Sequence, residues 1–326
     1  MLRGKPGEQG GGWLQKGRES GIPEPVTLGS TGGFIAGSGL AGCYFRGSSL
    51  CCRVIAAATK PFPTMILDAT CDITYTNESD VPALFMLRPR SGWAQWIMED
   101  HYHIGPRVQM VEFTDLYGNL CQRLVMPPGE FRASVKVRAD VQDRIDVDPA
   151  ASAMPVQTLP TDVLHYLLPS RYCQSDRMGD LALEIVGQTV PGYPSAEAIR
   201  AWINKNIHYQ YGTSDASTSA VDTVRTRQGV CRDFAHLGIA LCRCLSIPAR
   251  MVVGFLHELD PMDLHAWFEA YVNGRWFTFD ATQDQPRGNR IVVAYGRDAA
   301  DVALVTTFAP TTLNVMRVTV SAAPVP

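Results

Sequence analysis

Apolar and polar residues alternate strictly from Leu67 onward, just after Met65. The apolar positions are Leu67, Ala69, Cys71, Ile73 and Tyr75, and each residue between them is Asp or Thr. A period of two is typical of a strand that buries one face. We therefore predict a half-buried β-strand from Met65 onward.

Four further short runs of β-prone residues follow before about residue 147. They cover 83–87, 108–113, 121–126 and 131–137. Turn-forming residues such as Arg88-Pro89 and Pro127-Pro128-Gly129 separate them. Short strands with regular turn signals between them favour an antiparallel β-sandwich, and we assign residues 65–148 to this domain.

The pattern then changes to a helical period. Residues 149–161 are small and Pro-containing, which is typical of a linker. One-sided apolar stripes predict helices at 180–190, at 195–207 with Ser195 as the N-cap, and from Cys231 to about 246, where Pro248 ends the run.

Strand patterns follow these helices. They cover 251–255, 265–272, 276–279, 291–294 and 313–320. A group of helices followed by a sheet indicates an α+β domain. We assign residues 162–326 to this second domain.

Residues 1–64 show neither period, and they hold half of the 28 glycines. Such a segment cannot offset the entropy lost on ordering, so we predict that it is disordered. Because the alternation starts at Met65, a mis-assigned start is the other interpretation, with Met65 as the true first residue. Leu40-Ala41-Gly42-Cys43 resembles a lipoprotein cleavage site, although the apolar run before it is broken by glycines.

The composition is that of an ordinary soluble globular protein, with 46% apolar residues and a formal net charge of −3 over 326 residues. The Lys and Arg clusters that bind phosphate are absent from the sequence, so we expect no nucleic-acid partner. No run of eighteen apolar residues occurs, so no membrane span is expected. Nine cysteines without framework spacing favour a reducing compartment, and we predict a cytoplasmic location.

The predicted helix that begins at Cys231 places a thiol at a loop-to-helix junction. Free backbone N–H groups and the positive end of the helix dipole both favour an anion there, so a thiolate is stabilised. The same amides suit the oxyanion of a tetrahedral intermediate. A lone Cys that opens an apolar helix is more often a buried core residue, so the hypothesis needs a partner for the thiol.

Asn273-Gly274 is the strongest hairpin signal in the chain and predicts a type I′ turn in which Val272 pairs with Arg275. Following the register outward, His265 lies one diagonal step from Asp280 on the same face. The opposite face is apolar and is predicted to face the core. A carboxylate at the Nδ1 side of an imidazole holds it in the orientation that a general base needs, so Cys231, His265 and Asp280 are the candidate catalytic residues.

No metal or cofactor site is predicted. Cys242 and Cys244, with His236 and His257, offer zinc-binding side chains, but residues two apart on a helix point in different directions. The acidic run at 140–148 lacks the Gly and Glu of a calcium loop. We therefore expect a cofactor-free protein.

The segments around the three candidate residues form a specific set. They are 229–236 (GVCRDFAH), 247–250 (IPAR), 265–270 (HAWFEA) and 276–282 (WFTFDAT), with 209–212 (YQYG) upstream and 295–303 (YGRDAADVA) downstream. Together they resemble the bacterial transglutaminase-like superfamily. The resemblance implies a papain-like catalytic core preceded by an antiparallel β-sandwich domain, with Cys231 as nucleophile, His265 moving the proton and Asp280 orienting His265.

The resemblance leaves the outcome of the reaction open, because water or an amine can resolve an acyl-enzyme. Our leading hypothesis is a thiol peptidase or amidase that acts on a peptide or protein substrate. An amine acyltransferase that cross-links proteins and a non-catalytic peptide-binding module are the alternatives. Tyr209, Tyr211, Trp267 and Glu269 in the same segments are the candidate substrate-binding residues. The sequence indicates neither the substrate nor the oligomeric state.

Overall fold

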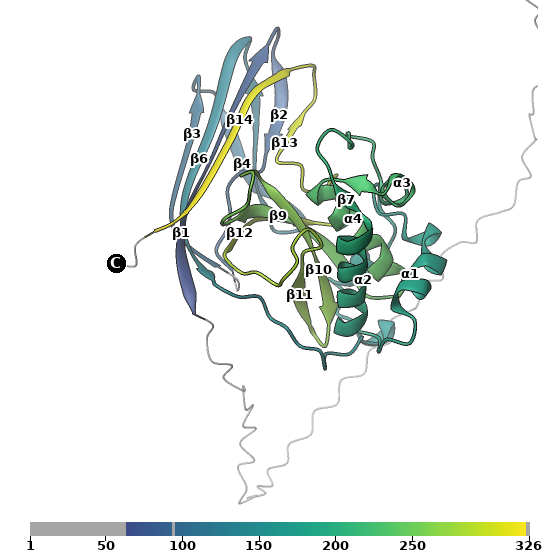
Figure 1. Cartoon of the computed structure of the whole chain (residues 1–326). Coiled ribbons are helices and arrows are strands. Elements are labelled where there is room, and N and C mark those ends of the chain that lie inside the picture. Colours follow the sequence, from purple (N-terminus) through teal and green to yellow (C-terminus); the bar gives the residue numbers. More distant parts are fainter. Residues whose placement is uncertain (1–62, 93–94, 324–326) are drawn as a thin grey trace, which may run out of the picture. The chain divides into compact units, whose positions relative to one another are not determined.

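The computed structural model describes residues 63–92 and 95–323 (Figure 1). The predictions for the glycine-rich segment 1–64, including the site at Cys43, fall almost entirely outside these residues. In the described part, no helix has both the length and the apolar character needed to cross a bilayer.

Eight strands form two antiparallel four-stranded sheets, which are drawn together at one side of Figure 1. One sheet has the order β14-β1-β6-β3, with β1 at Thr64–Asn77, β3 at Gln95–Gly105, β6 at Gly129–Gln142 and β14 at Thr312–Ala322. The other has the order β13-β2-β5-β4, with β2 at Val81–Phe85, β4 at Met110–Thr114, β5 at Leu120–Met126 and β13 at Val305–Thr307.

These strands bury one face each, as the alternation predicts. Leu67, Ala69 and Cys71 of β1 are fully buried. Phe85 of β2 meets Phe131 of β6 with ring centroids 6.0 Å apart, so the two sheets share one apolar interior. The predicted antiparallel sandwich is confirmed.

The last two strands return to this sandwich. The predicted strand at 313–320 is present as β14, and it pairs along β1 from Leu67 opposite Ala322 to Thr76 opposite Thr312. β13 pairs with β2. Residues that the sequence assigned to the catalytic domain thus complete the sandwich sheets and cover the outer edge of β1. The periodicity predicted the strand but held no information about its partner.

The remaining residues form the predicted α+β unit. Its helices are α1 at Gly179–Val186, α2 at Tyr193–Asn206, α3 at Ala220–Thr226 and α4 at Cys231–Cys244. Its antiparallel sheet has the order β11-β10-β9-β12, with β9 at Ala249–Leu256, β10 at His265–Val272, β11 at Arg275–Phe279 and β12 at Arg290–Gly296. A two-stranded parallel ladder joins β7 at His208–Tyr209 to β8 at Gln228–Gly229.

Two predicted helix ends are wrong. Ser195 is not an N-cap but lies inside α2, where its hydroxyl donates to the carbonyl of Val190 at 3.0 Å. Pro194 in the first turn presets the helical φ angle, so the helix begins earlier at Tyr193. α1 ends at Val186 because Gly187 adopts φ 51° and its N–H closes on the carbonyl of Leu183.

Helix α4 packs directly on β10. Gly238, in the middle of α4, faces the ring of Phe268, and a Cβ at Gly238 would lie only 2.4 Å from Phe268 Cε1. Phe268 in turn stacks on Phe279 of β11 with centroids 5.5 Å apart. The helix therefore approaches the sheet closely, and this packing sets where its N-terminus lies.

Two amide side chains of the sandwich bind the edge strand β12. Gln95 Oε1 accepts the N–H of Val292 at 2.6 Å, and Gln95 Nε2 donates to the carbonyl of the same residue at 2.8 Å. Asn119 binds Tyr295 in the same way, at 2.8 Å to its N–H and 2.7 Å to its carbonyl. Both amides are buried. They satisfy backbone groups that an edge strand otherwise leaves unpaired.

Candidate active site

Cys231 is the first residue of α4, and the local sequence explains its placement. The Val230 N–H donates to Asp233 Oδ2 at 2.9 Å, which caps the first turn. A Cβ at Gly229 would lie 2.7 Å from the Cβ of Asp233, so glycine is required for the carboxylate to fold back. Cys231 is half-buried, whereas Cys71, Cys121, Cys173 and Cys242 are buried.

The predicted hairpin is confirmed. Asn273 and Gly274 have φ angles of 49° and 80°, as a type I′ turn requires. Val272 pairs with Arg275 and Glu269 with Thr278. This register places His265, at the start of β10, beside Asp280, which directly follows β11.

The imidazole of His265 binds the carboxylate of Asp280. His265 Nε2 lies 2.8 Å from Asp280 Oδ2, and the two residues are 2% and 4% exposed. We expected the carboxylate at Nδ1, and this expectation is wrong. Strand register fixes which residues meet but not the rotation of the ring. With Nε2 occupied, Nδ1 is the other nitrogen of the ring, and Cys231 lies close enough to the His265 side chain to raise its pKa.

The protonation of this pair is set by opposing effects. Burial lowers the pKa of His265, but the charge of the Asp280 carboxylate and the hydrogen bond to it, with a smaller contribution from the nearby Cys231, outweigh burial and raise the pKa to about 9. Burial raises the pKa of Asp280, yet the charges of His265 and Arg290 hold that pKa far below its usual range. The arrangement therefore favours an imidazolium next to an ionised carboxylate.

Two other partners of Asp280 were not predicted. Thr282 donates to Asp280 Oδ1 from its N–H at 3.0 Å and from its hydroxyl at 2.7 Å. Arg290 Nη2 lies 2.8 Å from Asp280 Oδ2. Thr282 belongs to the segment WFTFDAT, which offered a signal, whereas Arg290 follows an aperiodic loop and has none.

Two of the predicted substrate-binding residues lie beside the thiol. β7 pairs with β8 so that Tyr209 is opposite Gly229, two residues before Cys231. Burial and the neighbouring Cys231 both raise the pKa of Tyr209. Tyr211 meets Tyr209 edge-on with ring centroids 5.5 Å apart. Both tyrosines are exposed, at 44% and 52%, and form an aromatic rim next to Cys231.

The other two substrate-binding candidates lie on the sheet face away from α4. Trp267 is buried and stacks on His265 with centroids 6.1 Å apart. Glu269 is held by Arg250, with Glu269 Oε2 2.8 Å from Nε and 2.6 Å from Nη2. The structure therefore does not bring Glu269 to the thiol.

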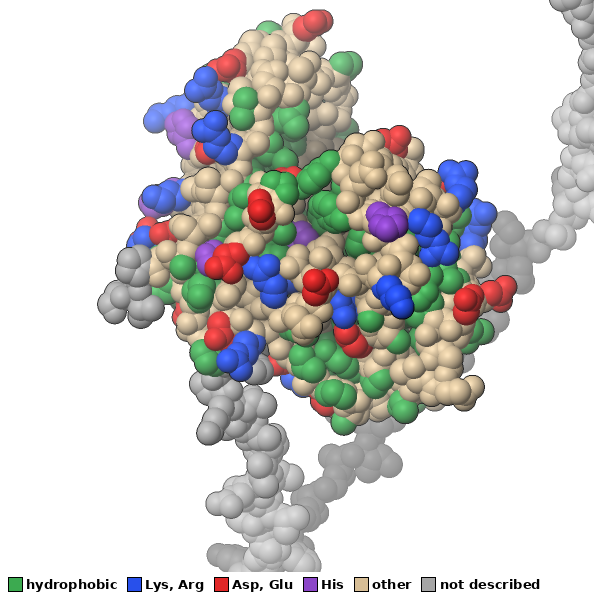
Figure 2. All heavy atoms as spheres, viewed as in Figure 1, with side chains coloured by type: hydrophobic (Ala, Val, Ile, Leu, Met, Phe, Trp, Pro, Cys, Tyr) green, Lys and Arg blue, Asp and Glu red, His purple; other side chains and the backbone are tan. Residues whose placement is uncertain are grey.

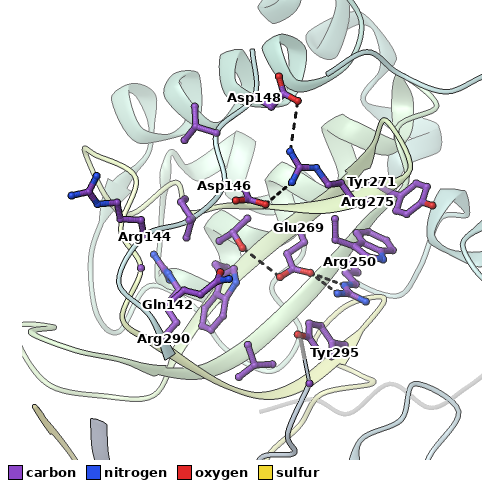
Figure 3. Close-up of a pocket in the computed structure, with 18 of the residues that line it drawn as sticks. Gln142, Arg144, Asp146, Asp148, Arg250, Glu269, Tyr271, Arg275, Arg290 and Tyr295 are labelled. Atoms are coloured by element: carbon purple, nitrogen blue, oxygen red, sulfur yellow. Dashed lines mark hydrogen bonds and ion pairs between the residues drawn. The ribbon is translucent and has the colours of Figure 1, made fainter. Parts of the chain in front are cut away.

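Trp267 and Glu269 line a cavity of about 1060 Å³ (Figure 3). Its walls come from β9 to β12 and from residues 142–148. Arg275 of β11 joins these two parts of the wall by pairing with Asp146 and Asp148. Cys231, His265 and Asp280 are not among the lining residues. This cavity is thus distinct from the thiol site, although Trp267 and Arg290 adjoin both.

Side chains with metal-binding groups do not cluster. Within residues 63–92 and 95–323, no three His, Cys, Asp or Glu side chains come together as a metal site. His236 is fully buried, stacks on Tyr172 and accepts the N–H of Ala299 at 3.1 Å, and burial lowers its pKa to about 3. On the face shown in Figure 2, acidic and basic side chains are interspersed.

Comparison with known proteins gives one consistent result. A family model described as the transglutaminase-like superfamily matches residues 179–281, which include Cys231, His265 and Asp280. The chain is 36% identical to a protein from Cytophaga hutchinsonii named as a candidate cysteine protease. The two structures superpose with a TM-score of 0.75 over 81% of this chain and 92% of that one.

Mycobacterial relatives extend the match. An uncharacterised protein of Mycobacterium leprae is 26% identical over 247 residues, which are 70% of this chain and 88% of that protein. An uncharacterised protein of Mycobacterium tuberculosis is 34% identical over 131 residues, 35% of this chain and 42% of its own length. The resemblance inferred from the motifs is confirmed, and the chain belongs to the transglutaminase-like superfamily.

Proposed function

We propose that the protein is a thiol hydrolase that cleaves peptide or amide bonds through an acyl-enzyme on Cys231. One observation supports this most strongly. A half-buried thiol at the N-terminus of α4 lies beside an imidazole whose Nε2 binds a buried carboxylate, and the thiol is near enough to raise the pKa of that imidazole. Thiol, base and orienting acid are the groups that nucleophilic catalysis requires.

In the first half of the reaction, the thiol proton is already held by His265 as an imidazolium, and the thiolate of Cys231 attacks the substrate carbonyl. The first N–H groups of α4 have no carbonyl partner within the helix, so they suit the developing oxyanion. The imidazolium then gives its proton to the leaving amine, which departs as the C–N bond breaks. The products of this half are the free amine and a thioester on Cys231.

In the second half, His265 removes a proton from water as the water attacks the thioester. Collapse of the tetrahedral intermediate breaks the C–S bond, returns the proton to the sulfur and releases a carboxylic acid. Asp280 keeps the imidazole oriented through both halves. Tyr209 lies beside Cys231 and meets Tyr211 edge-on, and these two tyrosines are the proposed contacts for the acyl part of the substrate.

Labelling with an electrophilic probe tests the nucleophile. We expect a peptidyl vinyl sulfone to modify Cys231 in the full chain before any other cysteine, as mapped by peptide mass spectrometry. Cys244→Ala is the matched control, because Cys244 is the other half-buried thiol of α4. Equal labelling of Cys231 and Cys244 would contradict the proposal.

Product analysis then tests the reaction. We expect a peptide library incubated with the protein to yield new carboxyl termini, and Cys231→Ala to abolish them. Adding a primary amine such as cadaverine separates hydrolysis from transfer, because a transferase yields the amine conjugate instead. Conjugates without cleavage products would refute the hydrolase proposal.

A further inference from the structure

Arg290 is a buried cation that meets the candidate catalytic carboxylate from a third strand. Its Nη2 lies 2.8 Å from Asp280 Oδ2, the same oxygen that binds His265 Nε2 at 2.8 Å. The side chains of Arg290 and Asp280 are only 6% and 4% exposed. An ion pair this deeply buried is screened little by solvent, so its charges act strongly on neighbouring groups.

The position of the Arg290 guanidinium is fixed on several sides. Its Nε donates to the carbonyl of Arg287 at 3.0 Å. Its planar end lies over the ring of Trp267, 4.8 Å from the centroid, and Trp267 itself stacks on His265. The cation is therefore fixed relative to both the carboxylate and the imidazole.

We propose that Arg290 is a positioning residue for the Cys231–His265 pair: acting through Asp280, it fixes the orientation of the carboxylate and limits how strongly that carboxylate retains the proton on His265. This inference rests on the proposed function, because it assigns a role within the same triad.

The size of the effect follows from the shared oxygen. His265 Nε2 and Arg290 Nη2 each lie 2.8 Å from Asp280 Oδ2, so they are at most 5.6 Å apart. At that separation, with an effective dielectric constant of about 20, one unit charge shifts a proton equilibrium by roughly two pH units. Removing the guanidinium takes away a repulsion on the imidazolium, so His265 then holds its proton to higher pH.

The readout is the pH dependence of Cys231 alkylation by iodoacetamide, measured on the full chain by mass spectrometry between pH 4 and 11. We expect the wild-type rate to show an upper inflection when the imidazolium loses its proton. Arg290→Met should move this inflection upward by roughly one pH unit or more. Arg290→Lys, which keeps the charge, should return it close to the wild-type position.

Arg287→Met is the matched control. Arg287 lies on the loop just before β12 and binds Gln283, Glu258 and the carbonyl of His257, without contact to Asp280. It should leave the inflection unchanged. Arg290→Gln serves as a second neutral variant if Arg290→Met does not fold, as judged by its thermal unfolding.

The outcomes separate this inference from the proposed function. If the wild type shows no thiolate reactivity below pH 8 at Cys231, the proposed function fails. If the wild type shows it and a folded Arg290→Met or Arg290→Gln variant has an unchanged or lowered inflection, only the role of Arg290 is overturned. A merely structural role would lower the unfolding temperature without moving the inflection.

Discussion

Gln95→Leu tests whether the sandwich supports the catalytic sheet. The substitution keeps the shape of the side chain but removes both hydrogen bonds to Val292, at 2.6 and 2.8 Å. The N–H and carbonyl of Val292 are then left buried without partners, and each costs about 1–3 kcal/mol. The third bond, to the carbonyl of the exposed Arg90, is replaced by water at little cost. We expect a loss of roughly 2–6 kcal/mol in the free energy of unfolding.

The assay is urea unfolding of the full chain followed by tryptophan fluorescence and far-ultraviolet circular dichroism. Gln122→Leu is the matched control, because Gln122 is also a buried amide of the sandwich but binds only Glu112, at 3.2 Å. Its Oε1 has no hydrogen-bond partner among the described residues, so an apolar replacement is nearly neutral. A Gln95→Leu loss below about 1 kcal/mol, or one equal to that of Gln122→Leu, would refute the reasoning.

Three other outcomes are expected. Gly238→Ala should destabilise the protein by about 1–3 kcal/mol in spite of its gain in helix propensity, because the new Cβ overlaps the ring of Phe268. Urea unfolding of the double variant with Phe268→Leu should show that part of this loss is recovered. The free energy of unfolding should fall by on the order of 3 kcal/mol as the pH rises from about 6.5 to about 9, because the folded state keeps a proton on His265 that the unfolded chain releases. A free energy of unfolding that does not change with pH in calorimetry would exclude the raised pKa of His265. Asp280→Asn removes the charge that raises the pKa of His265, so the upper inflection of the Cys231 alkylation rate should drop toward pH 6.5. An inflection still near pH 9 would disprove the role of Asp280 as the partner of His265.

The parts of the site that the sequence predicted depend on short-range signals. Asn273-Gly274 determines a turn, the turn determines the register, and the register places His265 beside Asp280. Gly229 and Asp233 likewise determine the cap that places Cys231 at the start of α4. Each signal acts over a few residues, so it could be read without knowing the fold.

The parts that were missed depend on contacts between distant segments. Arg290 reaches Asp280 from β12 across an aperiodic loop, and β14 pairs with β1, more than 200 residues earlier. Glu269 was predicted to bind substrate because it lies between site residues in sequence. It shares the face of β10 with His265 and Trp267, but it lies four residues further along the strand, where Arg250 and the cavity are.

The bonds that link the sandwich to β12 predict a role for this domain in the proposed chemistry. β12 begins with Arg290, and two residues later Val292 is bound by Gln95 of the sandwich. The strand that carries the proposed positioning residue is therefore held at its free edge by the other domain. Since Arg290 acts on His265 through Asp280 and through its own charge, a shift of β12 changes the proton affinity of the imidazole without touching the thiol. Gln95→Leu should then reproduce, in part, the alkylation profile of Arg290→Met, whereas Gly238→Ala acts on the other half of the site by moving α4 and Cys231. If Gln95→Leu lowers stability but leaves the upper inflection of Cys231 alkylation at its wild-type position, the sandwich stabilises the fold and has no influence on the triad.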